Sequence, residues 1–188
     1  MRLMLTALLC ANAAAAATGS VSGKVTATPE KYLKDTVVYL KEVPGTFPAK
    51  THTMDQKGME FRPRILLVTV GDTVKFLNSD GVEHNVYTPD GEAYNLGMFP
   101  KGQARDHKFT TPGTYTQLCS VHPEMLAYIF VGQNPFAAVV KKDGTFRIDG
   151  VPPGTWQVAV WNPKLKAEDA SATVTAGKSA RADFALAR

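Results

Sequence analysis

One short segment of the chain carries a thiol, an imidazole and a thioether at close spacing. Cys119, His122 and Met125 follow the pattern C-x2-H-x2-M, and a second imidazole, that of His84, comes from an earlier segment. A copper ion that alternates between its two oxidation states favours one soft thiolate, two imidazoles and a weakly bound thioether. We therefore predict a copper site made of His84, Cys119, His122 and Met125, in which Met125 is the weak axial ligand.

The cysteine content supports this prediction. An apolar run at residues 3–9 and small residues at 13–17 are typical of a short secretory signal peptide, here residues 1–17, that is cleaved before Thr18. Cys119 is then the only cysteine left, in an oxidising compartment where it has no internal disulfide partner. It is either an inert buried thiol or a metal-bound thiolate. The neighbouring His122 and Met125 favour the thiolate.

Charge and hydropathy limit the cellular location and the classes of binding partner that the sequence predicts. The signal peptide predicts a periplasmic or secreted protein, without a transmembrane segment, because no later apolar stretch approaches the ~20 residues that span a bilayer. The formal net charge is +4, and the basic residues form no clustered run. Nucleic acid is therefore excluded as a predicted partner.

Short apolar runs separated by turn dipeptides fill the rest of the chain, and no stripe of helical period is sustained. Pro112-Gly113 and Asp143-Gly144 are examples of the turns. This pattern predicts an all-β fold. The expected strand 114–118 delivers Cys119, the strand 127–131 leads away from the loop, and the strand 73–77 precedes His84.

The segment 70–76, the pair His84-Asn85, the segment 112–115 and the Cys119 loop occur in the order found in cupredoxins. The chain thus resembles the plastocyanin, azurin and amicyanin group over about residues 48–133. The C-x2-H-x2-M spacing is most similar to that of amicyanin. The resemblance implies a Greek-key β-sandwich with one type 1 (blue) copper ion that cycles between Cu(I) and Cu(II) and carries single electrons.

The resemblance also implies roles for residues around the metal. Asn85 would brace the thiolate and its loop, and the exposed edge of His122 would be the exit route for electrons. Pro123 and residues 98–100 would form an apolar rim. A redox partner such as a cytochrome or a dehydrogenase is expected. The sequence departs from the family pattern at Gln117, where an apolar or aromatic residue is expected in the core.

A second module follows the copper loop. Residues 144–160 have the pattern G-x-F-x-I-x-x-V-P-P-G-x-W-x-V-x-V, which resembles the carboxypeptidase-regulatory-like (CnaB-type) β-sandwich. The opening strands of such a sandwich match residues 23–25 and 35–40. We therefore expect a discontinuous sandwich at 18–47 plus 136–188, with the cupredoxin domain, 48–133, inserted in it or flanked by it. One enlarged cupredoxin with extra edge strands is the alternative.

Several functions compete. Four ligands leave copper no open position for a substrate, and four histidines in total are too few for further metal clusters, so we predict a protein that is not an enzyme, with no catalytic residues. A periplasmic copper carrier or sensor, and an adhesion or carbohydrate-binding module with a structural copper site, are the alternatives.

His52 and His107 have no partners at ligand spacing and are expected to face solvent. Trp161 has the opposite strand parity to the expected core residues 156, 158 and 160, so it is expected to face solvent or to cover the copper module. A sugar-stacking role is disfavoured, because one aromatic residue makes no platform.

Overall fold

The computed structural model describes residues 17–188 of the chain. The predicted signal peptide lies outside these residues except for its last position. Within them the regular structure is all β-strand apart from a short 3₁₀ turn, η1 (Glu30–Tyr32), so the all-β prediction is confirmed. No helix within residues 17–188 has the length and hydrophobicity that a membrane crossing requires.

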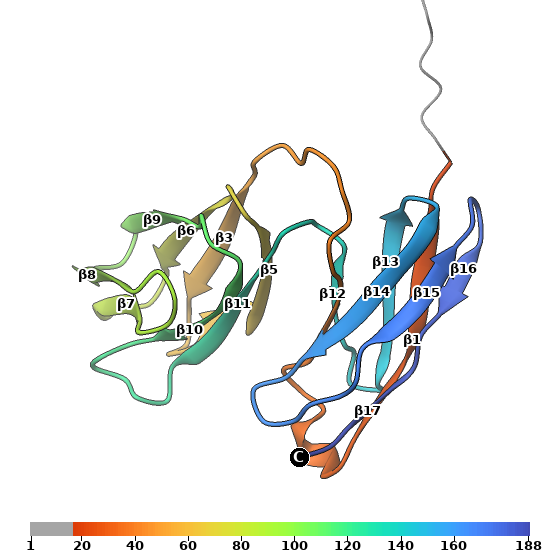
Figure 1. Ribbon diagram of the computed structural model, residues 1–188. Helices are drawn as coiled ribbons and strands as arrows, with labels where there is room; N and C mark the ends of the chain where they lie inside the picture. The colour runs from red at the N-terminus through yellow and green to blue at the C-terminus, as the bar shows by residue number, and fades with distance from the viewer. Residues whose placement is uncertain (1–16) are drawn as a thin grey trace, which may run out of the picture.

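The strands form two β-sandwiches that lie side by side, as Figure 1 shows. In the first sandwich, one sheet has the strand order β5-β11-β10-β7-β8 and the facing sheet has the order β4-β3-β6-β9. Neighbours in these sheets are often distant in sequence, as in a Greek key. The strands are β3 (Thr51–Gln56), β4 (Phe61–Arg62), β5 (Ile65–Thr69), β6 (Thr73–Asn78), β7 (His84–Thr88), β8 (Tyr94–Phe99), β9 (Ala104–Lys108), β10 (Gly113–Leu118) and β11 (Leu126–Gly132).

The alternation of side chains along these strands builds the core of the first sandwich. In β6, Val74 and Phe76 are fully buried while Lys75 between them is exposed. Successive side chains of a strand point to opposite faces, so one face of each sheet turns toward the other sheet. The ends of β7, β10 and β11 enter the same core, which includes Cys119 and Met125. The core of the first sandwich therefore reaches the predicted copper ligands.

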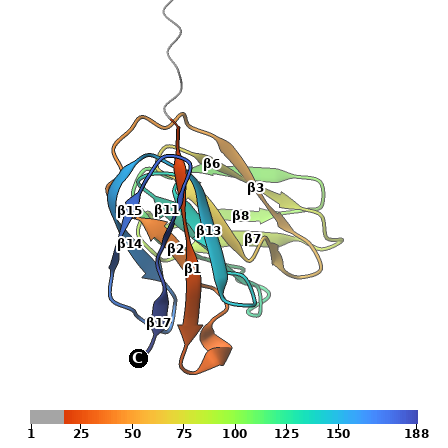
Figure 2. The same cartoon turned by 90° about the vertical axis from the view of Figure 1, so that its right-hand side faces the viewer.

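The second sandwich is built from strands at both ends of the described chain. One sheet has the order β13-β1-β16, with β17 also paired to β1, and the other has the order β12-β2-β14-β15. In Figure 2 this sandwich faces the viewer, and β1 runs beside β13. The strands are β1 (Gly19–Ala27), β2 (Val37–Leu40), β12 (Ala137–Val139), β13 (Thr145–Val151), β14 (Gly154–Trp161), β15 (Ala170–Val174), β16 (Ser179–Arg181) and β17 (Phe184–Leu186). The core is separate from that of the first sandwich.

A third, smaller apolar cluster joins the two sandwiches. Tyr128 of β11 packs edge-on against Trp161 of β14, with ring centroids 5.1 Å apart, and Phe130 packs against Tyr39 of β2 at 4.8 Å. Aromatic side chains bury large areas, and tilted or edge-to-face pairs add to that gain. Trp161 therefore covers the first sandwich, one of the two places predicted for it.

An ion pair reinforces this junction. Arg64, just before β5, donates to both carboxylate oxygens of Asp35 in the second sandwich, at 3.1 and 3.0 Å. A third nitrogen of the same guanidinium donates to the carbonyl of Leu126, 2.6 Å away, at the start of β11. Arg64 thus ties the second sandwich to the strand that follows Met125.

Candidate metal centre

Three neighbouring strands bring the predicted ligands to one end of the first sandwich. His84 is the first residue of β7, Cys119 follows the last residue of β10, and Met125 precedes β11. β10 pairs with both β7 and β11, which places the two loops together. The backbone N–H of Met125 donates to the carbonyl of His122 at 3.0 Å and closes the loop between Cys119 and Met125.

The side chains of His84, Cys119 and His122 converge. The two Nδ1 atoms lie 3.0 Å apart, and the sulfur of Cys119 lies 3.9 Å from Nδ1 of His84 and 3.8 Å from Nδ1 of His122. Metal–nitrogen and metal–sulfur distances of about 2.0 and 2.3 Å would separate ligands in one plane by roughly 3.5–3.7 Å. Within residues 17–188, His84, Cys119 and His122 form the one group of three or more histidine, cysteine or acidic side chains whose ligand atoms lie close enough to share a metal ion.

Burial differs among the four predicted ligands. His84 is 0% exposed, Cys119 3% and Met125 1%, whereas His122 is partly exposed. Met125 and Cys119 belong to the same buried core cluster. The centre is therefore shielded from water, and one imidazole reaches the surface.

Asp80 was not predicted as a functional residue, but it contacts His84 directly. Its carboxylate lies 2.9 Å from Nε2 of His84 and accepts the backbone N–H groups of Gly58 and Met59 at 2.6 and 2.9 Å. Burial opposes ionisation, but these hydrogen bonds outweigh it and lower the pKa of Asp80. An ionised Asp80 accepts the Nε2 proton and leaves the Nδ1 lone pair of His84 free for a metal. The spacing Asp-x3-His at the end of β6 is the signal that could have indicated it.

Asn85 connects β7 to the loop that begins at Cys119. Its side-chain oxygen accepts the backbone N–H of Ser120 at 2.6 Å and the Ser120 hydroxyl at 2.9 Å, and its amide nitrogen donates to Asn95 at 3.2 Å. These bonds hold the residue after Cys119 against the strand that carries His84.

Gln117 lies in the core, fully buried, where the family pattern predicts an apolar side chain. Its side-chain oxygen accepts a hydrogen bond from the Tyr94 hydroxyl at 2.5 Å, and its nitrogen donates to the carbonyl of Tyr115 at 3.2 Å. Burial raises the pKa of Tyr94, which therefore stays protonated as a donor. The buried amide is hydrogen-bonded on both sides, so the departure does not leave an unpaired polar group in the core.

The prediction that His52 and His107 face solvent is wrong. Nε2 of His52 lies 2.7 Å from the buried carboxylate of Asp72, which holds the start of β6. His107 is half-buried against the ring of Tyr94, with centroids 4.0 Å apart, and burial lowers its pKa. Both imidazoles pack against side chains that the sequence pattern did not place beside them.

Exposed apolar side chains flank His122 along the loop. Val121 is 51% exposed and Pro123 is exposed as well, so both neighbours of His122 in the loop present apolar groups. Met98, which pairs with Asn85 across β7 and β8, is 42% exposed, whereas Phe99 beside it is fully buried. Of the residues predicted for the apolar rim, Met98, Pro100 and Pro123 are thus exposed at the surface, and Phe99 is not.

Comparisons with known proteins agree with this site. Residues 49–132 match the family of copper binding proteins described as plastocyanin/azurin, and residues 132–182 match polysaccharide lyase family 4, domain II. Amicyanin from Paracoccus denitrificans is 33% identical over 126 residues, which cover 65% of this chain and 89% of that protein. Plastocyanin from Ulva prolifera is 32% identical over 79 residues, 36% of this chain and 80% of that protein.

Solved structures give similar matches. An amicyanin mutant in its oxidized state has 34% identity and a TM-score of 0.41, over 43% of this chain and 81% of that chain. A copper-containing nitrite reductase from Thermus scotoductus SA-01 has 28% identity and a TM-score of 0.43, over 50% of this chain and 24% of that chain. The prediction of copper as the cofactor is confirmed by the family match and by the converging donor set. The family match over residues 49–132 and the 33% identity to amicyanin over 89% of that protein show that the chain belongs to the plastocyanin/azurin family of copper-binding proteins, the cupredoxins.

Proposed function

We propose that this protein is an exported carrier of single electrons, with one copper ion bound by His84, Cys119, His122 and, axially, Met125. A bound copper ion would supply a centre that changes between Cu(I) and Cu(II) by one electron. The observation that carries the proposal is the convergence of one cysteine sulfur and two imidazoles beside a buried core that also contains Met125. Asn85 and Asp80 fix the orientation of this donor set from outside it.

Electron transfer fits the donor set better than substrate chemistry does. Four ligands complete the coordination of copper, whereas a catalytic metal normally keeps a position open. The fixed hydrogen bonds of His84 also favour little movement between oxidation states. We therefore propose that the chain is not an enzyme, although one similar solved structure is a nitrite reductase.

The partly exposed imidazole of His122 is the proposed exit for electrons. The apolar rim of Val121, Pro123 and Met98 around it suits a partner that docks by a similar patch and leaves quickly. A cytochrome or a dehydrogenase is the class of partner that we propose. We place the protein in the periplasm or outside the cell, on the basis of the signal peptide expected at residues 1–17.

We also propose the domain division 48–133 for the cupredoxin and 18–47 plus 136–188 for the second sandwich. Support comes from the strand pairing. β1 pairs with β13 and β2 pairs with β12, although the whole first sandwich lies between these strands in the sequence. Insertion of one domain into another is tolerated where the ends of the inserted domain lie close together.

Addition of Cu(II) to the purified protein tests the proposal. We expect an intense sulfur-to-copper charge-transfer band in the visible spectrum, a type 1 electron-spin-resonance signal and a reversible one-electron wave in voltammetry. Cys119→Ser should abolish the band because the thiolate sulfur is its origin. Val121→Ala, which shortens an exposed side chain of the same loop, should keep it.

Three results would speak for other functions. A colourless protein after loading would rule out a type 1 site. Rapid loss of the metal to a chelator, without a reversible wave, would favour copper delivery. Reduction of nitrite by the copper-loaded protein would show that it is an enzyme.

A further inference from the structure

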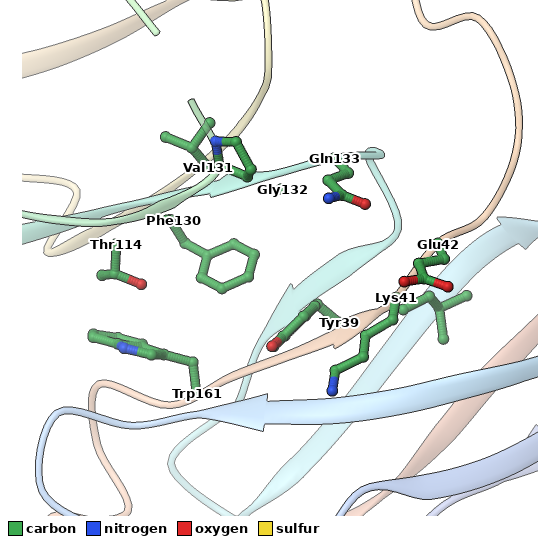
Figure 3. Close-up of a pocket in the computed structure, with 12 residues that line it drawn as sticks. Tyr39, Lys41, Glu42, Thr114, Phe130, Val131, Gly132, Gln133 and Trp161 are labelled. Carbon is green, nitrogen blue, oxygen red and sulfur yellow. The ribbon is translucent and has the colours of Figure 1, made fainter. Parts of the chain in front are cut away.

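A cleft opens between the two sandwiches, away from the copper ligands. It has a volume of about 490 Å³ and is lined by β2 and the residues after it, by the end of β14, by the start of β10 and by the end of β11 (Figure 3). Binding sites for small molecules commonly have this size and lie where two domains meet. Thr114 lines the cleft, and Cys119 lies five positions further along the extended chain, roughly 17 Å away. A molecule in the cleft would therefore not reach the copper centre.

Aromatic rings from both sandwiches flank this cleft. Trp161 and Tyr39 come from the second sandwich and Phe130 comes from the first. In Figure 3 the indole of Trp161 lies below an open space, with Phe130 and Thr114 above it and Tyr39 beside it. The sequence showed no aromatic partner for Trp161, whereas the fold brings Tyr39 and the largely buried Phe130 to the same cleft.

The cleft also presents polar groups that can form hydrogen bonds with the hydroxyl groups of a ligand. The hydroxyl of Tyr39 points into the space between Phe130 and Trp161, and the hydroxyl of Thr114 lies above Trp161 (Figure 3). The hydroxyls of Tyr39 and Thr114 and the amide of Gln133 line the cleft, and each can both donate and accept a hydrogen bond. Burial raises the pKa of Tyr39, so its hydroxyl stays a neutral donor and acceptor.

Among the described residues, the edge of the cleft offers no unpaired positive charge. Lys41 is paired with Asp169, and Glu42 is the next residue along the chain. The cationic group is therefore already neutralised, and an anionic ligand would find no free positive charge there. A wholly apolar ligand would bury the three polar groups without partners, which is costly.

We infer that this cleft binds a neutral sugar, with one face of a pyranose ring on Trp161 and its hydroxyl groups bonded to Tyr39, Thr114 and Gln133. The face of an indole carries partial negative charge and attracts the polarised C–H groups of a pyranose. Such a site would hold the protein on a glycan while the copper centre stays free. The inference does not depend on the electron-transfer role, because the two sites share no residue.

Calorimetric titration of the copper-loaded protein tests this inference. The probes are cellohexaose, chitohexaose and xylohexaose, with hexagalacturonate as an anionic comparison. We expect at least one neutral probe to bind one site per chain, more tightly than hexagalacturonate, without a change in the copper absorption band. Trp161→Ala should weaken that binding by about tenfold or more, because it removes the stacking surface.

Matched variants separate a binding role from a structural one. Tyr39→Phe and Thr114→Val each remove one hydroxyl and should weaken binding severalfold with an unchanged unfolding temperature. Trp156→Phe, at the other tryptophan of the chain, should leave binding unchanged, because the Trp156 ring nitrogen donates to the carbonyl of Pro152 within the second sandwich. The inference is overturned if none of the neutral probes binds, if hexagalacturonate binds most tightly, or if binding survives in Trp161→Ala and Thr114→Val.

Discussion

The contacts of single residues around His84 show how much of the metal centre depends on side chains that are not ligands. Asp80 accepts from both the His84 imidazole and the turn between β3 and β4. It therefore fixes the tautomer of the imidazole and its position at the same time. Partners of this kind typically contribute tenfold to a hundredfold to metal affinity.

Asp80→Asn should weaken copper binding by about tenfold to a hundredfold. The amide nitrogen that replaces one carboxylate oxygen cannot accept a proton from His84 or from the backbone N–H groups. Competition with a chelator of known affinity measures the change. Asp106→Asn, at an exposed position of β9, is the matched control and should behave as the unmodified protein. Equal affinities in the two variants would contradict the role of Asp80.

At the scale of elements, connections between strands are held by buried or half-buried carboxylates. Glu92, in the connection between β7 and β8, accepts the backbone N–H of Thr110 at 2.9 Å and its hydroxyl at 2.6 Å. Burial is the largest single influence and raises the pKa of Glu92. The hydrogen bonds from Thr110 and Thr111 together outweigh it, so that the pKa falls to about 2.

This lowered pKa predicts a loss of stability in acid. A carboxylate whose pKa is lower in the folded than in the unfolded state stabilises the fold above the unfolded value, 4.5, and loses that contribution as the pH falls toward about 2. The contribution should be on the order of 1 kcal/mol, because solvent screens a carboxylate near the surface. Denaturant unfolding at pH 6 and pH 3 measures it.

Glu92→Gln should lose less free energy of unfolding between these two pH values than the unmodified protein does. Glu168→Gln, at an exposed position, should retain the full pH dependence. The assignment fails if Glu92→Gln shows the same acid dependence as Glu168→Gln.

At the scale of the whole molecule, the junction between the sandwiches decides whether they behave as one body. The Asp35 side chain is 9% exposed and bonds both its oxygens to Arg64, which also donates to the carbonyl of Leu126 beside Met125. The Arg64 guanidinium also lies over the ring of Tyr128, 5.5 Å from its centroid, and Tyr128 belongs to the apolar cluster at the junction. The second sandwich is thus linked to the strand that follows the copper loop.

Arg64→Met should lower the free energy of unfolding by about 1–3 kcal/mol, because it leaves Asp35 largely buried without its charged partner. Differential scanning calorimetry measures the change and should show the two sandwiches unfolding at more widely separated temperatures. Arg62→Met, whose exposed pairing with Glu60 lies near the same turn, should change stability by less than about 1 kcal/mol. Equal effects of the two substitutions would show that the ion pair with Asp35 does not hold the junction.

Much of the metal centre follows from local features of the sequence. The spacing of Cys119, His122 and Met125 fits one short loop, and turn dipeptides with alternating apolar residues predict the strands on either side of it. These features depend on residue chemistry and on the period of a strand, which are local properties. The sequence by itself therefore determined copper, the all-β class and the presence of a second β-sandwich.

Other features were decided by the tertiary structure alone. The pairing of Asp35 with Arg64, the hydrogen bond that Gln117 accepts from Tyr94 and the meeting of Trp161 with Tyr128 all join residues far apart in the chain. The two-residue period of a strand determines which of its side chains share a face, but not which other strand or sheet those side chains pack against. Contacts between distant elements are set by how whole sheets pack, so no short pattern in the sequence could place them.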